Sequence, residues 1–216
     1  MNIAENLHQL KHKIPSTVTL VAVTKTKSVS EMMEAYEAGQ RDFGENKIQE
    51  MTAKYEQLPK DIRWHMIGHL QSNKVKYMAE FVHLIHGVDQ FKTLLKINKQ
   101  AKKHNRIINC LLQVHIATEE TKFGFSTHEI ETILASIELQ SLQNVNIIGL
   151  MGMATFTEDK TQIQTEFHFL SQLFHQLKIK YPHFSTLSMG MSSDYNIAIS
   201  EGSTIIRVGS AIFGTR

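Results

Sequence analysis

The chain has 216 residues, and 23 lysines and arginines against 21 aspartates and glutamates give it a formal net charge of +2. A charge so close to zero excludes a protein that binds nucleic acid through a strong positive field alone. Hydrophobic residues make up 42% and charged residues 20%, a composition typical of a folded globular protein and not of a disordered one. The length allows one domain with a full core, and we expect residues 1–216 to form a single domain.

The only cysteine is Cys110, so a disulfide bond within one chain is impossible. This cysteine usage favours a reducing compartment. Residues 1–15 contain no apolar stretch long enough for a signal peptide, and the longest uncharged segment, residues 139–157, is too polar to span a membrane. We therefore expect a cytoplasmic protein that contacts neither membrane nor nucleic acid.

Short runs of β-branched residues alternate along the chain with longer amphipathic segments. The predicted strands are residues 18–24, 41–43, 63–67, 82–88, 107–116, 145–150, 185–189 and 204–208. Strands that alternate with helices imply right-handed βαβ units and a parallel sheet. Eight such units in one undivided chain predict an α/β fold, a single (β/α)8 TIM-type barrel. Residues 2–13 are expected to form an extra helix before the first strand.

Apolar residues at helical spacing predict two of the helices between the strands. The first stripe consists of Ile130, Ile133, Leu134 and Ile137. The second stripe covers residues 163–177, with Asp159 placed to begin the helix and Pro182 placed to end it.

In a (β/α)8 barrel the binding and catalytic groups lie at the carboxyl ends of the strands, so the residues that follow each strand are candidates for the site. Lys25 follows the first strand, and strand alternation puts it on the same face as Val21 and Val23. If the valines face the interior, the amine stands at the mouth, where a partly desolvated lysine loses its proton more easily and attacks a carbonyl carbon. The alternative is a solvated lysine, like Lys27.

The last strand carries Arg207 on the same face as Ile205 and Gly209. An arginine that points into a barrel is costly unless it meets a hydrogen-bond acceptor. Gly209 permits a close approach of the backbone, and the N–H groups of Gly209 and Ser210 can point into a cavity.

The seventh strand ends in a turn at Gly190, after which Ser192 or Ser193 is expected to cap a helix with Asp194 in its first turn. The hydroxyl of Ser192 and the first N–H groups of that helix would bind an anion. Two anion-binding turns on adjacent strands predict a phosphate site.

Three further strand ends are less decisive. Asn46, after the second strand, either directs its amide into the mouth or caps a helix. Met151 and Met153, after the sixth strand, either pack against a flat ligand or fill the core. His65 and His69 have no evident third ligand, so we expect no metal site.

A lysine for an aldehyde, a phosphate site and an inward arginine together describe a pocket for pyridoxal 5′-phosphate (PLP). Lys25 would hold the aldehyde as a Schiff base, and Arg207 would face the pyridine nitrogen. Because arginine is always cationic, the ring nitrogen would stay unprotonated and the ring would be a weaker electron sink. Aminotransferase chemistry is therefore disfavoured, whereas racemisation or simple storage of PLP remains open.

Seven blocks in the same order resemble those of the pyridoxal phosphate homeostasis proteins, which are similar to the alanine racemase N-terminal barrel. The blocks are AVTKTK (residues 22–27), FGEN (43–46), WHMIGHLQSNK (64–74), KFG (122–124), GLMGM (149–153), LSMGMSSD (187–194) and GSTIIRVGSAIFGTR (202–216). The resemblance implies that the PLP lysine is Lys25 and not Lys27, and that Arg207 lies at the pyridine nitrogen. The implied phosphate contacts are Ser192, Gly209 and Ser210, with Asn46 near the ring.

The resemblance also implies a role in vitamin B6 and amino-acid/keto-acid homeostasis without catalytic turnover. It implies a monomer whose partners are PLP and, by extension, PLP-dependent apo-enzymes. A competing interpretation is a PLP-dependent amino-acid racemase with Tyr195 or a histidine as the second base. Because the sequence ends at Arg216, directly after the last strand, we expect no further domain to supply that base. A third interpretation, a Schiff-base aldolase without PLP, leaves Arg207 unexplained.

Overall fold

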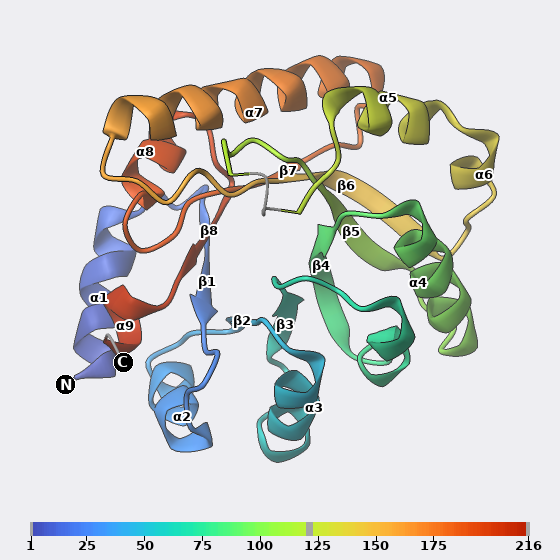
Figure 1. Cartoon of the computed structure of the whole chain (residues 1–216). Coiled ribbons are helices and arrows are strands. Elements are labelled where there is room, and N and C mark those ends of the chain that lie inside the picture. Colours follow the sequence, from blue (N-terminus) through green and yellow to red (C-terminus); the bar gives the residue numbers. More distant parts are fainter. Residues whose placement is uncertain (1, 120–122, 215–216) are drawn as a thin grey trace.

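The computed structural model describes residues 2–119 and 123–214, and the eight strands found there close into a parallel barrel in the order β1 to β8 (Figure 1). The strands are β1 (Thr19–Val23), β2 (Asp42–Glu45), β3 (Arg63–Met66), β4 (Val82–Val88), β5 (Ile108–Gln113), β6 (Val145–Met151), β7 (Thr186–Ser188) and β8 (Ile205–Val208). The predicted (β/α)8 barrel is confirmed. Lys122 and residues 215–216, which belong to two of the seven sequence blocks, lie outside the described residues.

Helices surround the barrel (Figure 1). They are α1 (Ile3–Lys13), α2 (Val29–Glu37), α3 (Ile48–Gln57), the 3-10 helix η1 (Ser72–Tyr77), α4 (Phe91–Lys103), α5 (Thr127–Ala135), α6 (Ile137–Gln140), α7 (Lys160–Lys180), α8 (Tyr195–Ser200) and α9 (Ser210–Phe213). The expected N-terminal helix is α1, and Asn6 joins it to α9 by donating a hydrogen bond to the carbonyl of Ile212 (3.0 Å). Throughout residues 2–119 and 123–214, no helix is both long and apolar enough to cross a membrane.

The long helix α7 confirms both of its predicted boundaries. The Asp159 side chain accepts hydrogen bonds from the N–H groups of Thr161 and Gln162, and the helix ends at Lys180, before Pro182. The predicted stripe from Ile130 to Ile137, by contrast, is not one helix.

The stripe is interrupted at Ser136, where α5 ends and the short helix α6 begins. The Ser136 hydroxyl accepts a hydrogen bond from the N–H of Leu139 (3.2 Å), which caps α6. As a result Ile137 turns away from the core and is 80% exposed. A local side-chain cap therefore competes with the helical periodicity at this point.

Two predicted strands differ in their ends. The second strand is β2, which continues past the predicted residue 43 to Glu45, with all four residues buried. The fifth predicted strand, residues 107–116, ends at Gln113, because the chain then leaves the barrel and Val114 forms only an isolated bridge with Phe125.

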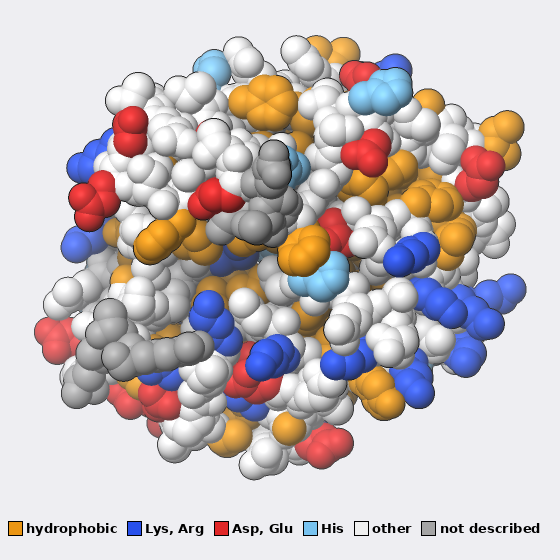
Figure 2. Space-filling model, viewed as in Figure 1, with side chains coloured by type: hydrophobic (Ala, Val, Ile, Leu, Met, Phe, Trp, Pro, Cys, Tyr) orange, Lys and Arg blue, Asp and Glu red, His pale blue; other side chains and the backbone are white. Residues whose placement is uncertain are grey.

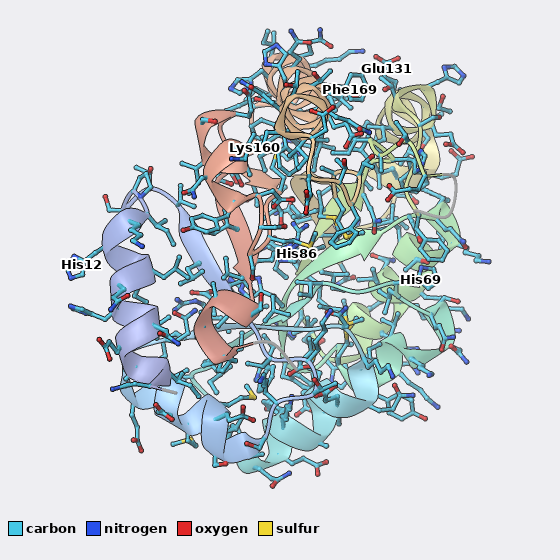
Figure 3. All side chains as sticks on the ribbon, turned by 60° about the vertical axis from the view of Figure 1, so that its left-hand side comes forward. His12, His69, His86, Glu131, Lys160 and Phe169 are labelled. Atoms are coloured by element: carbon cyan, nitrogen blue, oxygen red, sulfur yellow. The ribbon has the colours of Figure 1, made fainter. Side chains whose placement is uncertain are left out.

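Two sets of buried side chains make up the interior. The larger apolar cluster lies mainly between barrel and helices, and a smaller one consists of Val21, Leu84, Leu111, Met151 and Ile205. Part of the barrel interior is polar, since the fully buried His86 of β4 lies among the strands (Figure 3). Its ring contacts the hydroxyl of Ser188 of β7, a strand that is not its neighbour in the sheet.

Gly190 makes the turn after β7 in a left-handed conformation (φ 95°), as predicted. A Cβ added there would lie 2.6 Å from the Cβ of Ala198, whereas a Cβ added at Gly39, with φ 86°, would have nothing within 4 Å.

We expect Gly39→Ala to lower the free energy of unfolding by about 1 kcal/mol through backbone strain alone. Gly190→Ala should cost roughly 1–3 kcal/mol more, because it adds steric overlap. Urea unfolding of both variants measures the difference, and equal losses would contradict this packing.

Candidate functional site

A cavity of about 630 Å³ opens at the carboxyl ends of the strands, which is where the barrel fold predicts a site. Figure 2 shows a hollow on this face of the molecule, with lysine and arginine side chains beside it. Six of the seven predicted site residues line the cavity: Lys25, Asn46, Ser192, Arg207, Gly209 and Ser210. They follow or end β1, β2, β7 and β8, so the closed sheet brings together segments that are far apart in the sequence.

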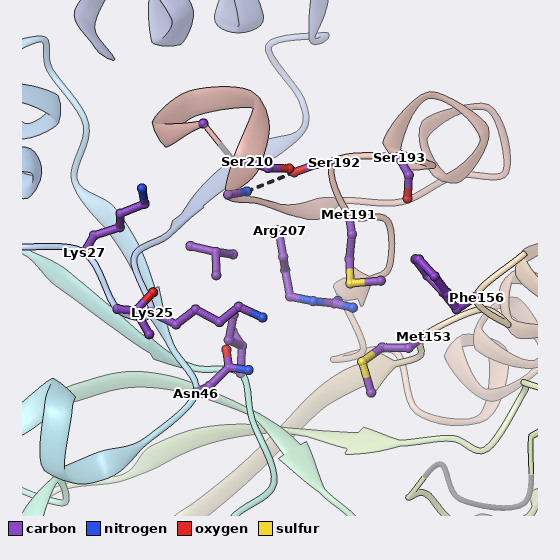
Figure 4. A pocket seen from close by; sticks show the side chains of 15 residues that line it. Lys25, Lys27, Asn46, Met153, Phe156, Met191, Ser192, Ser193, Arg207 and Ser210 are labelled. Atoms are coloured by element: carbon purple, nitrogen blue, oxygen red, sulfur yellow. Dashed lines mark hydrogen bonds between the residues drawn. The ribbon is translucent and has the colours of Figure 1, made fainter. Parts of the chain in front are cut away.

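The alternation predicted for the first strand continues into the cavity. Val21 is fully buried inside the barrel, Val23 lines the cavity floor, and Lys25 lines the cavity one pleat further on. The Lys25 side chain extends into the space between Asn46 and Arg207 (Figure 4). It is exposed, and its ammonium has no hydrogen-bond or ion-pair partner among the described residues.

The segment that carries Lys25 is held in an uncommon conformation. Thr26, the next residue, has a φ of 63°, which is unfavourable for a β-branched side chain. Its N–H donates a hydrogen bond of 2.6 Å to the carboxylate of Glu50 on α3, which offsets part of this strain. The backbone at Lys25 is therefore fixed by the neighbouring helix.

A cluster of charged side chains also holds the segment that precedes Lys25. The ammonium of Lys54 donates to the carbonyl of Thr24 and to the carboxylates of Glu45 and Glu50, each at 2.7 Å. The hydroxyl of Thr24 also donates to Glu45 (2.6 Å). Burial raises the pKa of Glu45, although the Lys54 ammonium opposes that shift. These residues tie the end of β1 to β2 and α3.

Arg207 points into the cavity as predicted, and it meets the acceptors that an inward arginine requires. Its guanidinium donates to the hydroxyl of Ser188 (2.7 Å) and to the carbonyl of Gly152 (3.1 Å). Burial lowers the pKa of Arg207 to about 10, while the nearby Asp194 carboxylate raises it. Two of the five guanidinium N–H groups are used in these bonds, so three remain for other acceptors.

The turns after β7 and β8 are joined to each other. The N–H of Gly209 donates to the hydroxyl oxygen of Ser192 (3.1 Å), the dashed line in Figure 4. A side chain at Gly209 would crowd the backbone of β1, because an added Cβ would lie 3.2 Å from the carbonyl oxygen of Val23. Ser210 begins α9, so its N–H has no acceptor within that helix. Ser192 and Ser210, which belong to these two joined turns, both line the cavity.

The expected capping by Ser192 or Ser193 is wrong. The helix that follows, α8, begins at Tyr195, and Asp194 occupies its N-cap position without making a side-chain capping bond. The Asp194 carboxylate instead accepts from the N–H of Met191, which closes the turn, and burial raises the pKa of Asp194. Ser192 is free of the helix because its hydroxyl is engaged by the neighbouring turn.

Asn46 and the two methionines after β6 each had two possible roles, and the structure decides between them. Asn46 lines the cavity and does not cap α3, whose N-cap residue is Lys47. Met151 is fully buried in the small cluster inside the barrel and does not line the cavity, whereas Met153, two residues later, does. At the end of the sixth strand, the first methionine to line the cavity is therefore two residues later in the sequence than Met151.

Several lining residues were not singled out from the sequence. They include Thr26, Ile67, Phe156, Met191 and Gly214. Phe156 and Met191 lie opposite Lys25 across the cavity (Figure 4). Ile67 directly follows β3 and Met191 directly follows the turn at Gly190, and both positions were usable signals. Phe156 lies in a loop with no such pattern.

Arg207→Met tests whether the buried guanidinium serves stability or binding. Methionine fills a similar volume without a buried charge, so the ligand-free variant should unfold with a free energy equal to that of the parent or about 1 kcal/mol higher. Arg207→Ala, which leaves a cavity, should lose about 2 kcal/mol or more. Chemical denaturation without ligand provides the comparison. A methionine variant as unstable as the alanine variant would show that the guanidinium supports the fold.

Comparison with known proteins agrees with this geometry. Residues 1–216 match the family of the alanine racemase N-terminal domain. Over its whole length the chain is 38% identical to the pyridoxal phosphate homeostasis protein of Haemophilus influenzae and 36% identical to that of Escherichia coli K12, and it covers 97% of each.

Among solved structures, PipY of Synechococcus elongatus with PLP bound is 37% identical, with a TM-score of 0.90 and coverage of 98% of this chain and 100% of PipY. Alanine racemase of Clostridium difficile is 16% identical, with a TM-score of 0.76, and shares the fold over 100% of this chain and 57% of the racemase. The chain therefore belongs to the alanine racemase N-terminal domain family, and its full-length relatives include pyridoxal phosphate homeostasis proteins.

Proposed function

We propose that this protein binds PLP in the cavity at the barrel mouth, with Lys25 bonded covalently to the cofactor, and that it acts in vitamin B6 and amino-acid/keto-acid homeostasis. One observation carries the proposal: the amine of Lys25 lies across a single cavity from the turns that bear the hydroxyls of Ser192 and Ser210. Within the part of the chain that the structure describes, this amine has no partner. The relatives named for PLP homeostasis and the PLP-bound structure of PipY support it.

The residues present suit the cofactor. A cavity of about 630 Å³ is in the usual range for small ligands and cofactors. Bound PLP supplies an aldehyde carbon that condenses with an amine, forming a carbon–nitrogen double bond and releasing one water. Lys25 is the better amine for this bond, because the ammonium of Lys27 donates to the carbonyl of Phe213 (3.0 Å) and pairs with Glu31 (3.3 Å).

The remaining contacts follow from the donors at the cavity. Ser192 and Ser210 offer hydroxyl groups, and Gly209 lets the backbone come close, so these turns would hold the phosphate. Arg207 would present its free N–H groups to the pyridine nitrogen, and Asn46 would lie near the ring. Because a guanidinium donates and cannot accept, the ring nitrogen would remain an acceptor, without a proton of its own.

The side chains at the cavity favour binding over racemisation. A racemase needs a second acid or base, which would have to be Tyr195 or a histidine at the mouth. Among the described residues that line the cavity, the titratable side chains are Lys25, Lys27 and Arg207, and neither Tyr195 nor a histidine is present. An aldolase without PLP would gain nothing from a buried Arg207.

The wider role is part of the same proposal. We place the protein in the cytoplasm as a monomer of one domain, with PLP and PLP-dependent apo-enzymes as its partners. Cys110 is buried and burial raises the pKa of its thiol, so it is not placed to form a disulfide bond with another chain.

Lys25→Ala and Lys27→Ala distinguish the two amines. Incubation with PLP should give the parent protein a visible absorption band, and borohydride should then fix one pyridoxyl group on the peptide that contains Lys25. Lys25→Ala should lose the band and the fixed mass, whereas Lys27→Ala should keep both. Absorption spectra and peptide mass spectrometry give the readout. A parent that stays colourless, or a label on Lys27, would refute the assignment.

A further inference from the structure

A line of polar side chains crosses the barrel interior beneath Arg207. The hydroxyl of Ser188, which accepts from Arg207, lies 2.8 Å from Nδ1 of His86. Nε2 of His86 lies 2.9 Å from Nδ1 of His65, and Nε2 of His65 lies 3.0 Å from the carboxylate of Asp42. We call Asp42, His65, His86 and Ser188 the buried column, since each is at most 8% exposed.

The buried column joins the two ends of the barrel. At its far end Asp42 is held by Arg63 through two bonds, from Nε (2.8 Å) and from Nη2 (2.5 Å). Asp42 and Arg63 line a second cavity, of about 320 Å³, at the amino ends of the strands. Although burial opposes it, hydrogen bonds from Arg63 and His65 hold the pKa of Asp42 below its usual range, so this carboxyl group is ionised.

The two ends fix the direction of every hydrogen bond between them. Arg207 can only donate, so Ser188 accepts from it, and an ionised Asp42 can only accept, so Nε2 of His65 carries a proton. When His65 is neutral, its Nδ1 must accept from Nε2 of His86, and Nδ1 of His86 then accepts the Ser188 hydroxyl proton. In this arrangement every proton in the buried column has an acceptor.

The opposite direction would leave a group unpaired. It would require a doubly protonated His65 and a His86 that donates from Nδ1 to Ser188. The Ser188 hydroxyl would then receive two donors, and its own proton would have no acceptor among the described contacts, at a position that is fully buried. Burial also lowers the pKa of His86 well below its usual range, so this ring is not a second source of positive charge in the buried column.

Polar groups inside a barrel need a reason, because bulky apolar residues usually fill this space. Neither Ser188 nor His86 lines the cavity at the mouth, so neither is placed to touch a ligand there. Among the described contacts, the bond from Arg207 to Ser188 is what joins the buried column to the site.

We propose that Asp42, His65 and His86 are positioning residues for Arg207, acting through the hydroxyl of Ser188. Ionised Asp42 sets the direction of the buried column, which keeps the Ser188 oxygen turned toward Arg207 as an acceptor. The guanidinium is thereby held with its remaining N–H groups toward the cavity. The inference deepens the proposed PLP site. Its expected effect on the cofactor rests on the proposed function, whereas the hydrogen-bond direction in the buried column is independent of PLP.

The direction can be read directly in the ligand-free protein by NMR of histidines labelled with nitrogen-15. We expect His65 and His86 to be neutral, each with its proton on Nε2. Asp42→Asn removes the constraint, because an amide can present either its oxygen or its NH₂ group to His65. The Ser188 proton, which has no acceptor in the opposite direction, still disfavours that direction. Both rings should therefore gain a minor but detectable fraction of the second tautomer. The matched control is Asp61→Asn, an exposed carboxylate that pairs with Arg41 at the same end of the barrel and should leave both rings unchanged.

The effect on the site is measured with PLP itself. If the coupling has the usual size for such networks, Asp42→Asn should raise the dissociation constant for PLP by roughly 2- to 30-fold and shift the absorption maximum of the bound cofactor. Asp61→Asn should do neither. Ser188→Ala, which removes the last link and is the second variant if Asp42→Asn does not fold, should weaken PLP binding while both histidines keep their tautomers.

Three results would overturn the inference: a parent His86 with its proton on Nδ1, unchanged tautomers in Asp42→Asn, or Asp42→Asn and Ser188→Ala proteins that bind PLP with parental affinity and spectrum. A protein that binds no PLP at all would refute the proposed function and leave the tautomer test intact. The two failures are therefore distinguishable.

Discussion

The pairing of β1 with β8 is the constraint on which the site depends. Val21 stands opposite Arg207 in this parallel pair, so the end of β1 and the turn after β8 leave the sheet at the same edge. Only a closed barrel brings the first and last strands together, and closure thereby places the amine of Lys25 across one cavity from the hydroxyls of Ser192 and Ser210. The chemistry proposed for the protein follows from this adjacency.

A second theme is that the protein keeps charged and polar groups where apolar ones would pack more simply. Arg207 is held by a hydroxyl and a carbonyl, and no carboxylate bonds to it within the described residues, which costs stability but leaves donors free for a ligand. Lys54 and Glu45, also buried, fix the segment before Lys25. Both of these buried polar sets thus support a residue that the proposed function uses, as expected when function and stability compete.

The sequence predicted the barrel because strand and helix patterns alternate along the whole chain, and it predicted most of the site because a barrel places strand ends together. It failed where a local interaction overrode periodicity, as at Ser136, or where a tertiary contact replaced a cap, as at Ser192. It also misplaced Met151, since strand ends cannot be located to within one pleat from a pattern. The buried column could not be predicted from the sequence, because only barrel closure brings His86 and Ser188 into contact.

A crystal structure of the protein soaked with PLP tests the central claim most directly. The account predicts electron density that is continuous from Nζ of Lys25 to the cofactor, with the phosphate against the turns of Ser192 and Ser210 and the pyridine nitrogen toward Arg207. Density joined to Lys27, or a phosphate bound away from these two turns, would contradict it.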